Sequence, residues 1–437
     1  MNRDPLPPQP QACNHEAHRV KIHEWESIAQ FISAAAKPDG LHVIDTGRDT
    51  HLDILTSGDP YRPASKPTLV IFNGAVTKRD ERVPPFLSGR GIAHDTGWPF
   101  VAISDPSIGL SKDTSIAWYA GNSQVNLQRE IFRLIRPLSR VQKNLWLVGG
   151  SAGGFAALVF GHMLGSAASV FVWNAQTDVL EYSAGYVKNY VKNSFPEIAG
   201  RMNEYDWKKY ARNKFRRHNY IYSIQEAFLP HQRPRRILYL QNHNDWHVIS
   251  HCVPYLNSFN YKRLGDGLYA QDENHVIWFP EIGNGHPAPH KDAILTILKS
   301  VSAPQWSLLD SVEIMEATGV FPVNQRSPLT RPRAIHHWGK RISDRIRIEE
   351  SGRKITVTLK DLPLHYGGVS VGFASYVEGS RIDRQLYNSG LYEYTVPIKD
   401  HKKIIVRILV QDGFGNPLKS ETIEVSSYSE LNSVDGA

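Results

Sequence analysis

The chain has 437 residues, with 50 lysines and arginines against 43 aspartates and glutamates and a formal net charge of +7. This length exceeds what one hydrophobic core normally supports, which predicts two domains. Hydrophobic residues make up 41% and charged residues 21%, as in globular proteins. Acidic residues are mixed among the basic ones, so the composition lacks the charge blocks of a nucleic-acid-binding tail, and we expect no nucleic-acid partner.

The N-terminal residues and the cysteine content bear on localisation. Cys13 and Cys252 are the only cysteines, too few for a disulfide framework or a cysteine-rich zinc site. Residues 1–20 are polar and proline-rich without the apolar core of a signal peptide, and no apolar run is long enough to span a bilayer. We therefore expect a flexible arm over residues 1–20, no transmembrane segment and a cytoplasmic location.

The residues that follow predict one helix and two strands. Apolar residues recur at helical spacing over residues 22–36, and a Pro-Asp-Gly sequence ends this pattern at Gly40. Residues 41–45 and 51–55 alternate with a period near two, as paired strands with one solvated face do. We expect them to form the antiparallel edge of a larger sheet.

A series of short apolar runs predicts a mostly parallel sheet covered by helices, because strands buried on both faces lack polar alternation. A crossover helix is expected over residues 122–138, stopping near Pro137. The predicted strands are residues 68–72, 99–103, 145–148, 170–173, 237–240 and 276–279.

Residues 181–236 interrupt this series of predicted strands and connecting helices. They contain eleven aromatic residues and twelve lysines or arginines against five acidic residues. An insertion of this composition between two strands predicts a helical cap over the carboxyl edge of the sheet, where ligands bind in such folds. A helical excursion whose aromatic residues form a core of their own is the alternative.

The C-terminal part has a different pattern. Residues 324–344 are rich in Arg, Pro and His and predict a linker after a domain over residues 21–323. Short strand-like runs separated by turn residues then fill residues 345–428, which predicts a β-sandwich of immunoglobulin or fibronectin type. Such a module can bind a protein or glycan partner.

The most informative stretch is residues 145–158, where four apolar residues lead into a glycine-flanked serine and then a helix-forming run. Its centre, Gly149-Gly150-Ser151-Ala152-Gly153, has the pattern Gly-x-Ser-x-Gly. This predicts a strand, a sharp turn and a helix, with the serine hydroxyl clear of the sheet. The N-terminus of that helix would direct backbone N–H groups at negative charge developing near Ser151. An incidental serine in a glycine-rich turn is the alternative.

A serine nucleophile needs a base, usually histidine, and a carboxylate that orients the base. Asp245 lies a few residues after the predicted strand 237–240, and His286 lies on a glycine-rich loop after the predicted strand 276–279. Asp272 could compete with Asp245. Other histidines near these two loops are His247, His251, His275 and His290.

This chain order of nucleophile, acid and histidine after successive strands resembles the α/β-hydrolase superfamily over residues 41–301. The resemblance implies that Ser151 is the nucleophile, Asp245 the acid and His286 the base. It implies no cofactor. It also implies an oxyanion hole formed by the backbone N–H of Ala152 and that of Gly74 or Ala75, on the loop after an earlier strand.

Two further groups of residues are candidates for binding. The aromatic residues Trp118, Tyr119 and Trp246 lie on loops near the predicted site and could contact a substrate. Imidazole and carboxylate groups also suit zinc or iron, and a metal-binding interpretation stays open for His243, Asp245, His247 and His251, although we expect no metal.

These features predict a serine-dependent carboxylic-ester hydrolase that acts through an acyl-enzyme on a small-molecule or polysaccharide ester. The basic, aromatic cap and the β-sandwich favour a decorated carbohydrate. An O-acyltransferase would use the same triad. A non-catalytic hydrolase-like scaffold that binds a glycan or protein partner is a third interpretation.

Overall fold

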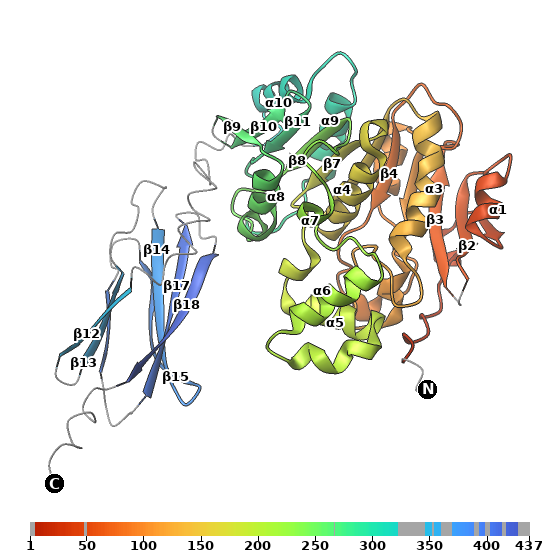
Figure 1. The fold of residues 1–437 in the computed structure, drawn as a ribbon. Helices are drawn as coiled ribbons and strands as arrows, with labels where there is room; N and C mark the ends of the chain where they lie inside the picture. The colour runs from red at the N-terminus through yellow and green to blue at the C-terminus, as the bar shows by residue number, and fades with distance from the viewer. Residues whose placement is uncertain are drawn as a thin grey trace, which may run out of the picture. The chain divides into compact units, whose positions relative to one another are not determined.

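The computed structural model describes residues 5–47, 50–265, 267–321, 346–351, 354–359, 369–388, 393–397, 403–412 and 417–426. These residues form two compact units. The first is built on one large sheet, and the second on two small antiparallel sheets (Figure 1).

The large sheet has 11 strands in the order β1-β2-β3-β5-β4-β6-β7-β8-β11-β10-β9. Neighbouring strands from β5 to β11 run parallel, whereas β3 is antiparallel to both β2 and β5. This confirms the predicted mostly parallel sheet with an antiparallel edge. The strands are β1 (Ile22–Trp25), β2 (Gly40–Asp45), β3 (His51–Ser57), β4 (Thr68–Phe72), β5 (Phe100–Ile103), β6 (Leu145–Gly150), β7 (Ser169–Trp173), β8 (Arg236–Leu240), β9 (Lys262–Gly265), β10 (Leu268–Asp272) and β11 (His275–Trp278).

Helices cover both faces of this sheet. Figure 1 shows α3, α4 and α8 in front of it, and α9 and α10 pack on the core that contains Trp146, Val148 and Phe171. The helices are α1 (Ile28–Ser33), α2 (Arg90–Thr96), α3 (Leu127–Val141), α4 (Ala152–Leu164), α8 (Val253–Ser258), α9 (Lys291–Val301) and α10 (Leu308–Ala317). Shorter helical segments are Glu16–His18, Arg79–Glu81, Pro106–Leu110, Gly165–Ala167, Val179–Glu181 and Val248–Cys252. None of the helices in the described part of the chain is both long and apolar enough to cross a membrane.

Two predicted helices differ from the observed ones. Residues 22–36 were expected as one helix, but β1 pairs with β2, and α1 begins only after Ser27, whose side chain accepts a hydrogen bond from Gln30 N. The crossover helix α3 begins after Asn126 and continues through Pro137 to Val141. A proline inside a helix removes one backbone hydrogen-bond donor. The helix nevertheless continues, and its apolar residues are buried both before and after Pro137.

The N-terminal segment, for which the sequence predicts a flexible arm, makes hydrogen bonds to the first unit. Gln11 N donates to Gly109 O over 2.8 Å, and Asn14 N donates to Pro84 O over 2.7 Å. The buried Arg79 guanidinium also donates to Gln11 Oε1. Backbone and side-chain contacts together therefore fix the path of the chain around Gln11 and Asn14.

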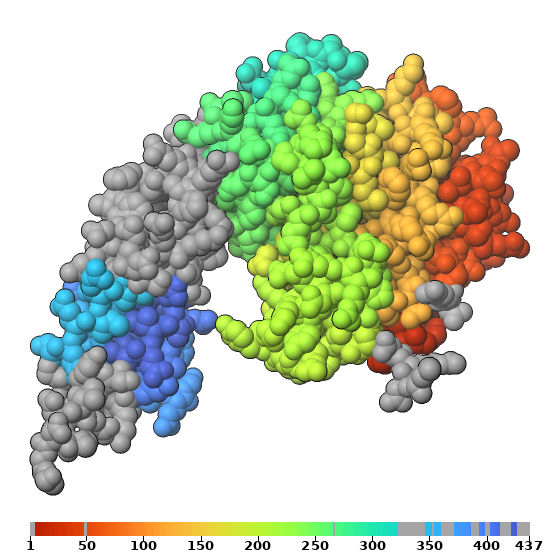
Figure 2. All heavy atoms as spheres, viewed as in Figure 1, coloured from red at the N-terminus to blue at the C-terminus, as the bar shows by residue number. Residues whose placement is uncertain are grey.

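The insertion after β7 is helical, as predicted. It contains α5 (Ala184–Ser194), a 3₁₀ helix (Pro196–Asn203), α6 (Trp207–Arg217) and α7 (Ile224–Ala227), and most of it forms the yellow-green lobe in Figure 2. Five of its aromatic side chains are buried and pack on one another, as the alternative interpretation expects of a separate aromatic core. These are Tyr190, Phe195, Phe215, Tyr220 and Tyr222.

The second unit is a β-sandwich, as predicted. One sheet has the order β12-β13-β16 and the other β15-β14-β17-β18. Buried residues of both sheets, among them Val357, Phe373 and Ile408, form a single core. The strands are β12 (Ile346–Ser351), β13 (Lys354–Leu359), β14 (Val369–Val377), β15 (Ser380–Asn388), β16 (Glu393–Pro397), β17 (Lys403–Asp412) and β18 (Pro417–Ser426). The predicted linker, residues 324–344, lies outside the described residues.

Candidate active site

Ser151 occupies the sharp turn between β6 and α4. Its backbone has φ 54° and ψ −119°, a conformation that a non-glycine residue adopts only where the surroundings enforce it. A Cβ atom on Gly149 would lie 2.3 Å from Gly153 O, and one on Gly153 would lie 2.3 Å from Phe72 O. Glycine is therefore required at both positions, and the predicted strand, turn and helix are confirmed.

The first residue of α4 and the loop after β4 both lie next to the half-buried Ser151. The first N–H groups of an α-helix have no acceptor within the helix, and Ala152 is the first residue of α4. The loop after β4 lies against the same turn, because a Cβ atom on Gly74 would be 3.1 Å from Gly150 O and 3.7 Å from Ser151 Cβ. The use of Ala152 with Gly74 or Ala75 as oxyanion donors stays a prediction, and this placement supports it.

The loop that contains Gly74 is held by Tyr119. The Tyr119 hydroxyl accepts a hydrogen bond from Asn73 N over 2.8 Å and donates to Asn73 Oδ1 over 2.6 Å. The backbone N–H of Tyr119 in turn donates to Asp105 Oδ2 over 2.6 Å. Burial raises the pKa of the Asp105 carboxyl to about 6. These hydrogen bonds hold the loop after β4 in place. A small shift of Tyr119 would therefore move Asn73 and Gly74, whose backbone lies beside Ser151.

Gln176, which the sequence analysis missed, contacts the Ser151 side chain directly. Its Nε2 donates to Ser151 Oγ over 3.0 Å, and its Oε1 accepts a hydrogen bond from Trp118 Nε1. The indole donor fixes the orientation of the amide, since only the amide oxygen can accept a hydrogen bond. A serine hydroxyl has one donor and two acceptor positions, so Ser151 can accept from Gln176 and still donate to a base.

The predicted substrate contacts of Trp118 and Tyr119 are wrong. Each side chain is only 1% exposed, which leaves no ring face for a ligand. Both residues have positive φ values, 54° and 56°, and both bond to residues next to Ser151. They are positioning residues. Trp246 is 36% exposed, and a substrate contact at this residue stays a prediction.

The loop after β11 carries His286. Asn242, two residues after the end of β8, donates through Nδ2 to Gly283 O and to Gly285 O, each over 2.8 Å. Asn174, directly after β7, donates to Pro287 O over 2.7 Å. The loop is thus held at the carboxyl ends of two parallel strands, and β7 neighbours the strand that leads into Ser151.

His251 contacts the segment after β7 and lies near enough to His286 to feel its charge. Burial, with the nearby His286 as a smaller cause, lowers the pKa of His251 to about 3. Its Nδ1 accepts a hydrogen bond from Thr177 N over 3.4 Å, and Thr177 follows Gln176 in the chain. His251 is therefore neutral at physiological pH, and its ring accepts a hydrogen bond from the backbone of the segment that follows β7.

Asp245 follows β8 and is fully buried. Its Oδ1 accepts a hydrogen bond from His247 N over 2.9 Å. Ligand atoms of Asp245, His247 and His286 lie within 4.8 Å of one another, a spacing that suits a hydrogen-bonded acid and base as well as a metal ion. The role of Asp245 as the acid stays a prediction that this proximity supports.

The competing acid and one competing histidine lie elsewhere. Asp272 Oδ1 is 2.7 Å from His275 Nδ1, and Asp272 Oδ2 is 2.8 Å from Arg233 Nη1. Asp272 ends β10 and His275 begins the antiparallel strand β11, so both lie at the ends of the strands opposite those that carry Ser151 and His286. Asp272 and His275 are therefore excluded as triad members.

Comparisons with known proteins give similarities only among solved structures, since no family model and no curated protein matches the chain. The capsule O-acetyltransferase of Neisseria meningitidis serogroup A has 13% identity and a TM-score of 0.41, over 60% of this chain and 95% of that one. Acetyl xylan esterase 1 from Thermoanaerobacterium sp. has 13% identity and a TM-score of 0.37, over 67% and 94%. A puromycin hydrolase has 18% identity and a TM-score of 0.36, over 60% of this chain and 38% of that one. The sheet order and the serine turn described above identify the fold of the first unit as the α/β-hydrolase type.

Proposed function

We propose that the chain is a serine-dependent carboxylic-ester hydrolase that works through an acyl-enzyme on Ser151. One observation carries the proposal: Ser151 has a strained backbone at the N-terminus of α4, and its Oγ is contacted by an oriented amide donor. Strain of this kind persists where the surrounding structure over-determines it, and it clusters at functional sites.

The proposed reaction begins with proton transfer. His286 accepts the Ser151 hydroxyl proton while Oγ forms a bond to the ester carbonyl carbon, and the carbonyl electron pair moves onto its oxygen. The N–H groups of Ala152 and of Gly74 or Ala75 stabilise this oxyanion. When the intermediate collapses, the bond to the alcohol breaks and His286 returns the proton to the leaving oxygen. Water repeats the steps on the acyl-enzyme, while Asp245 holds the imidazole in orientation.

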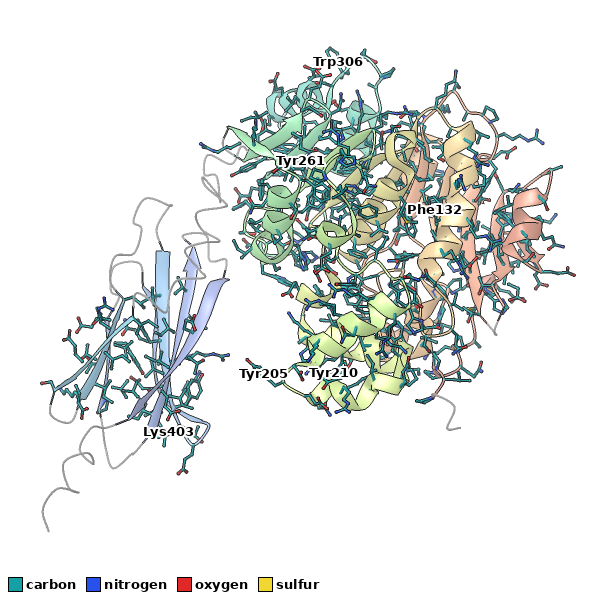
Figure 3. All side chains as sticks on the ribbon, viewed as in Figure 1. Phe132, Tyr205, Tyr210, Tyr261, Trp306 and Lys403 are labelled. Atoms are coloured by element: carbon teal, nitrogen blue, oxygen red, sulfur yellow. The ribbon has the colours of Figure 1, made fainter. Side chains whose placement is uncertain are left out.

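We propose a decorated carbohydrate as the substrate class. The cap supplies the supporting features, because it is basic and carries polar and aromatic groups on its outside. Tyr205 is fully exposed, and Figure 3 shows Tyr205 and Tyr210 in the same outer part of the cap. Exposed aromatic rings can stack on sugars, and the surplus of lysines and arginines would attract an anionic polysaccharide.

The experiment that tests the proposal is turnover of a chromogenic acetyl ester by the full chain. Ser151→Ala and His286→Ala should each lower kcat by about 10⁴-fold or more, since removal of one triad member disables the others. His290→Ala is the matched control, because His290 is close in sequence but is the N-cap residue of α9. Full turnover by Ser151→Ala would overturn the proposal.

Hydrolysis and transfer differ only in the acceptor of the acyl group. If a sugar hydroxyl replaces water in the second half of the reaction, the same residues perform O-acyl transfer. Product analysis with an added oligosaccharide separates the two outcomes: free carboxylate supports hydrolysis, and an acylated sugar supports transfer. A chain that forms neither product and fails to react with a fluorophosphonate would be a binding scaffold.

A further inference from the structure

Cys13, His15 and Asp53 form a cluster where the N-terminal segment meets β3. Asp53 Oδ1 lies 3.0 Å from His15 Nε2, and Asp53 Oδ2 lies 3.7 Å from Cys13 Sγ. All three residues offer metal-ligand atoms within 4.8 Å of one another. In the sheet, β5 and β4 separate β3 from the strand that leads into Ser151. We propose that this cluster is a second site, which binds a divalent transition-metal ion of the zinc type.

The observed spacing is close to what such an ion requires. Zinc binds thiolate sulfur at about 2.3 Å, imidazole nitrogen at about 2.0 Å and carboxylate oxygen at about 2.1 Å, so tetrahedral ligand atoms lie about 3.4 to 3.6 Å apart. The separations in the structure, 3.0 Å from His15 Nε2 to Asp53 Oδ1 and 3.7 Å from Cys13 Sγ to Asp53 Oδ2, lie on either side of this range. Small side-chain rotations would therefore place an ion between the three groups.

The backbone around the cluster holds the ligands in position. Hydrogen bonds of Gln11 N and Asn14 N to the first unit flank Cys13 on both sides. Asp53 lies within β3 and is only 4% exposed. A carboxylate this deeply buried needs donors or a cation beside it. Without an ion these are the His15 ring and the Cys13 thiol, and a metal ion would satisfy the carboxylate more completely.

A candidate for the fourth ligand, His51, lines the same cavity. His51 and Asp53 lie two residues apart on β3, and side chains at this spacing share one face of a strand. Both residues, together with Cys13 and His15, line one cavity of about 250 Å³. The His51 ring could complete a tetrahedral Cys-His-Asp-His set, or water in the cavity could occupy the fourth position.

Uptake of the ion is balanced by proton release. The Cys13 S–H bond breaks, its proton passes to the solvent, and the sulfur electron pair forms the bond to the metal. His15 binds the ion through its neutral ring. The hydrogen bond between His15 and Asp53 is then replaced by one bond from each residue to the ion. The step needs no oxidant or reductant.

The test is titration of the reduced, metal-free full chain with Co²⁺, followed by absorption spectroscopy. A thiolate ligand produces a sulfur-to-cobalt charge-transfer band in the near ultraviolet, and a tetrahedral site produces strong visible bands. We expect both for one Co²⁺ per chain, displaced by one equivalent of Zn²⁺. Cys13→Ser and Asp53→Asn should lose the charge-transfer band, and His51→Ala should weaken binding but keep the band.

Cys252→Ser is the matched control, because Cys252 is the other cysteine of the chain and is buried, and it should keep the band. Thermal unfolding without metal checks that the variants fold, and Zn²⁺ should raise the Tm of the wild type but not that of Cys13→Ser. Cobalt at Asp245, His247 and His286 would give no sulfur band. Absence of the band in the wild type, or its persistence in Cys13→Ser, would overturn the proposal. Neither result bears on Ser151.

Discussion

Gln176 Nε2 lies 3.0 Å from Ser151 Oγ, and the backbone N–H of the same glutamine donates to Ser151 O over 3.1 Å. Two hydrogen bonds from one residue thus fix both the backbone and the side chain of the proposed nucleophile. The segment after β7 is therefore part of the candidate site, although it contains none of the residues of the proposed triad.

Gln176→Ala should lower kcat/KM for an acetyl ester by about 3- to 10-fold, because one neutral hydrogen bond contributes about 0.5 to 1.5 kcal/mol. The loss should appear in kcat, since the amide contacts the attacking oxygen. Steady-state kinetics measure it. Gln142→Ala is the matched control, because Gln142 is a buried glutamine whose amide bonds to Pro60 O and Arg62 O away from Ser151. Equal kinetics of the two variants would contradict a role for Gln176.

Tyr119→Phe should lower kcat with little effect on KM, because it removes the acceptor for Asn73 N and frees the loop that carries Gly74. It should also cost about 1 to 3 kcal/mol of unfolding free energy, since a buried N–H loses its partner. Tyr190→Phe serves as the comparison, as it removes a buried hydroxyl on the cap helix α5 that donates to Gly121 O. Urea unfolding and ester kinetics on both variants should show similar destabilisation and a loss of activity in Tyr119→Phe alone.

Gly153→Ala should disrupt the turn, because the added Cβ would meet Phe72 O and the backbone of Asn73. Backbone must shift to relieve this contact, so we expect a destabilisation of several kcal/mol, as for other overpacked cores, together with loss of activity. Gly185→Ala is the control within α5, where an added Cβ meets nothing within 4 Å. That variant should be stabilised by roughly 0.5 to 1 kcal/mol. The free energies of unfolding in urea check both values.

Asp105 should make stability fall between about pH 4 and pH 6. Burial raises its pKa from 3.8 to about 6, so in this window the folded chain keeps a proton that the unfolded chain has lost. The free energy of unfolding therefore decreases with rising pH, by on the order of 3 kcal/mol at most. Burial raises the pKa of Asp178 to about 6 as well, and Asp178 contributes with the same sign.

Asp105→Asn should remove the Asp105 part of this slope, even though the variant loses one acceptor and is less stable at every pH. Urea unfolding of the wild type and the variant across this range measures the difference. If the free energies of unfolding of the wild type and of Asp105→Asn changed with pH in the same way, Asp105 would have the same pKa in the folded and unfolded chains, and the prediction would be wrong.

The parts of the site that the sequence predicted depend on short-range patterns. The turn at Ser151 could be predicted because its strand, glycines and helix are consecutive, and the parallel strands could be predicted because burial on both faces leaves continuous apolar runs. The edge strand β1 was predicted as a helix because the strand that pairs with it, β2, lies beyond the reach of its local residue pattern (Ile22 pairs with Leu41). The pairing that decides its conformation is tertiary.

Long-range contacts also explain the residues that were missed. Gln176 lies three residues after the end of the apolar strand β7, and polar residues just beyond such a strand were a usable signal. No sequence pattern near Gln176, however, indicates that the Trp118 indole donates a hydrogen bond to its amide oxygen and so orients the amide. Cys13, His15 and Asp53 come together only because the N-terminal segment is bonded along the first unit, which an expectation of a flexible arm could not anticipate.

The central claim is that Ser151 is an activated nucleophile, and the most direct measurement is intact-protein mass spectrometry after exposure to a fluorophosphonate. We predict one adduct per chain, mapped by peptide sequencing to Ser151, absent in Ser151→Ala, and strongly slowed in His286→Ala but not in His290→Ala. A wild-type chain that acquires no adduct, or an adduct that persists in Ser151→Ala, would contradict the account.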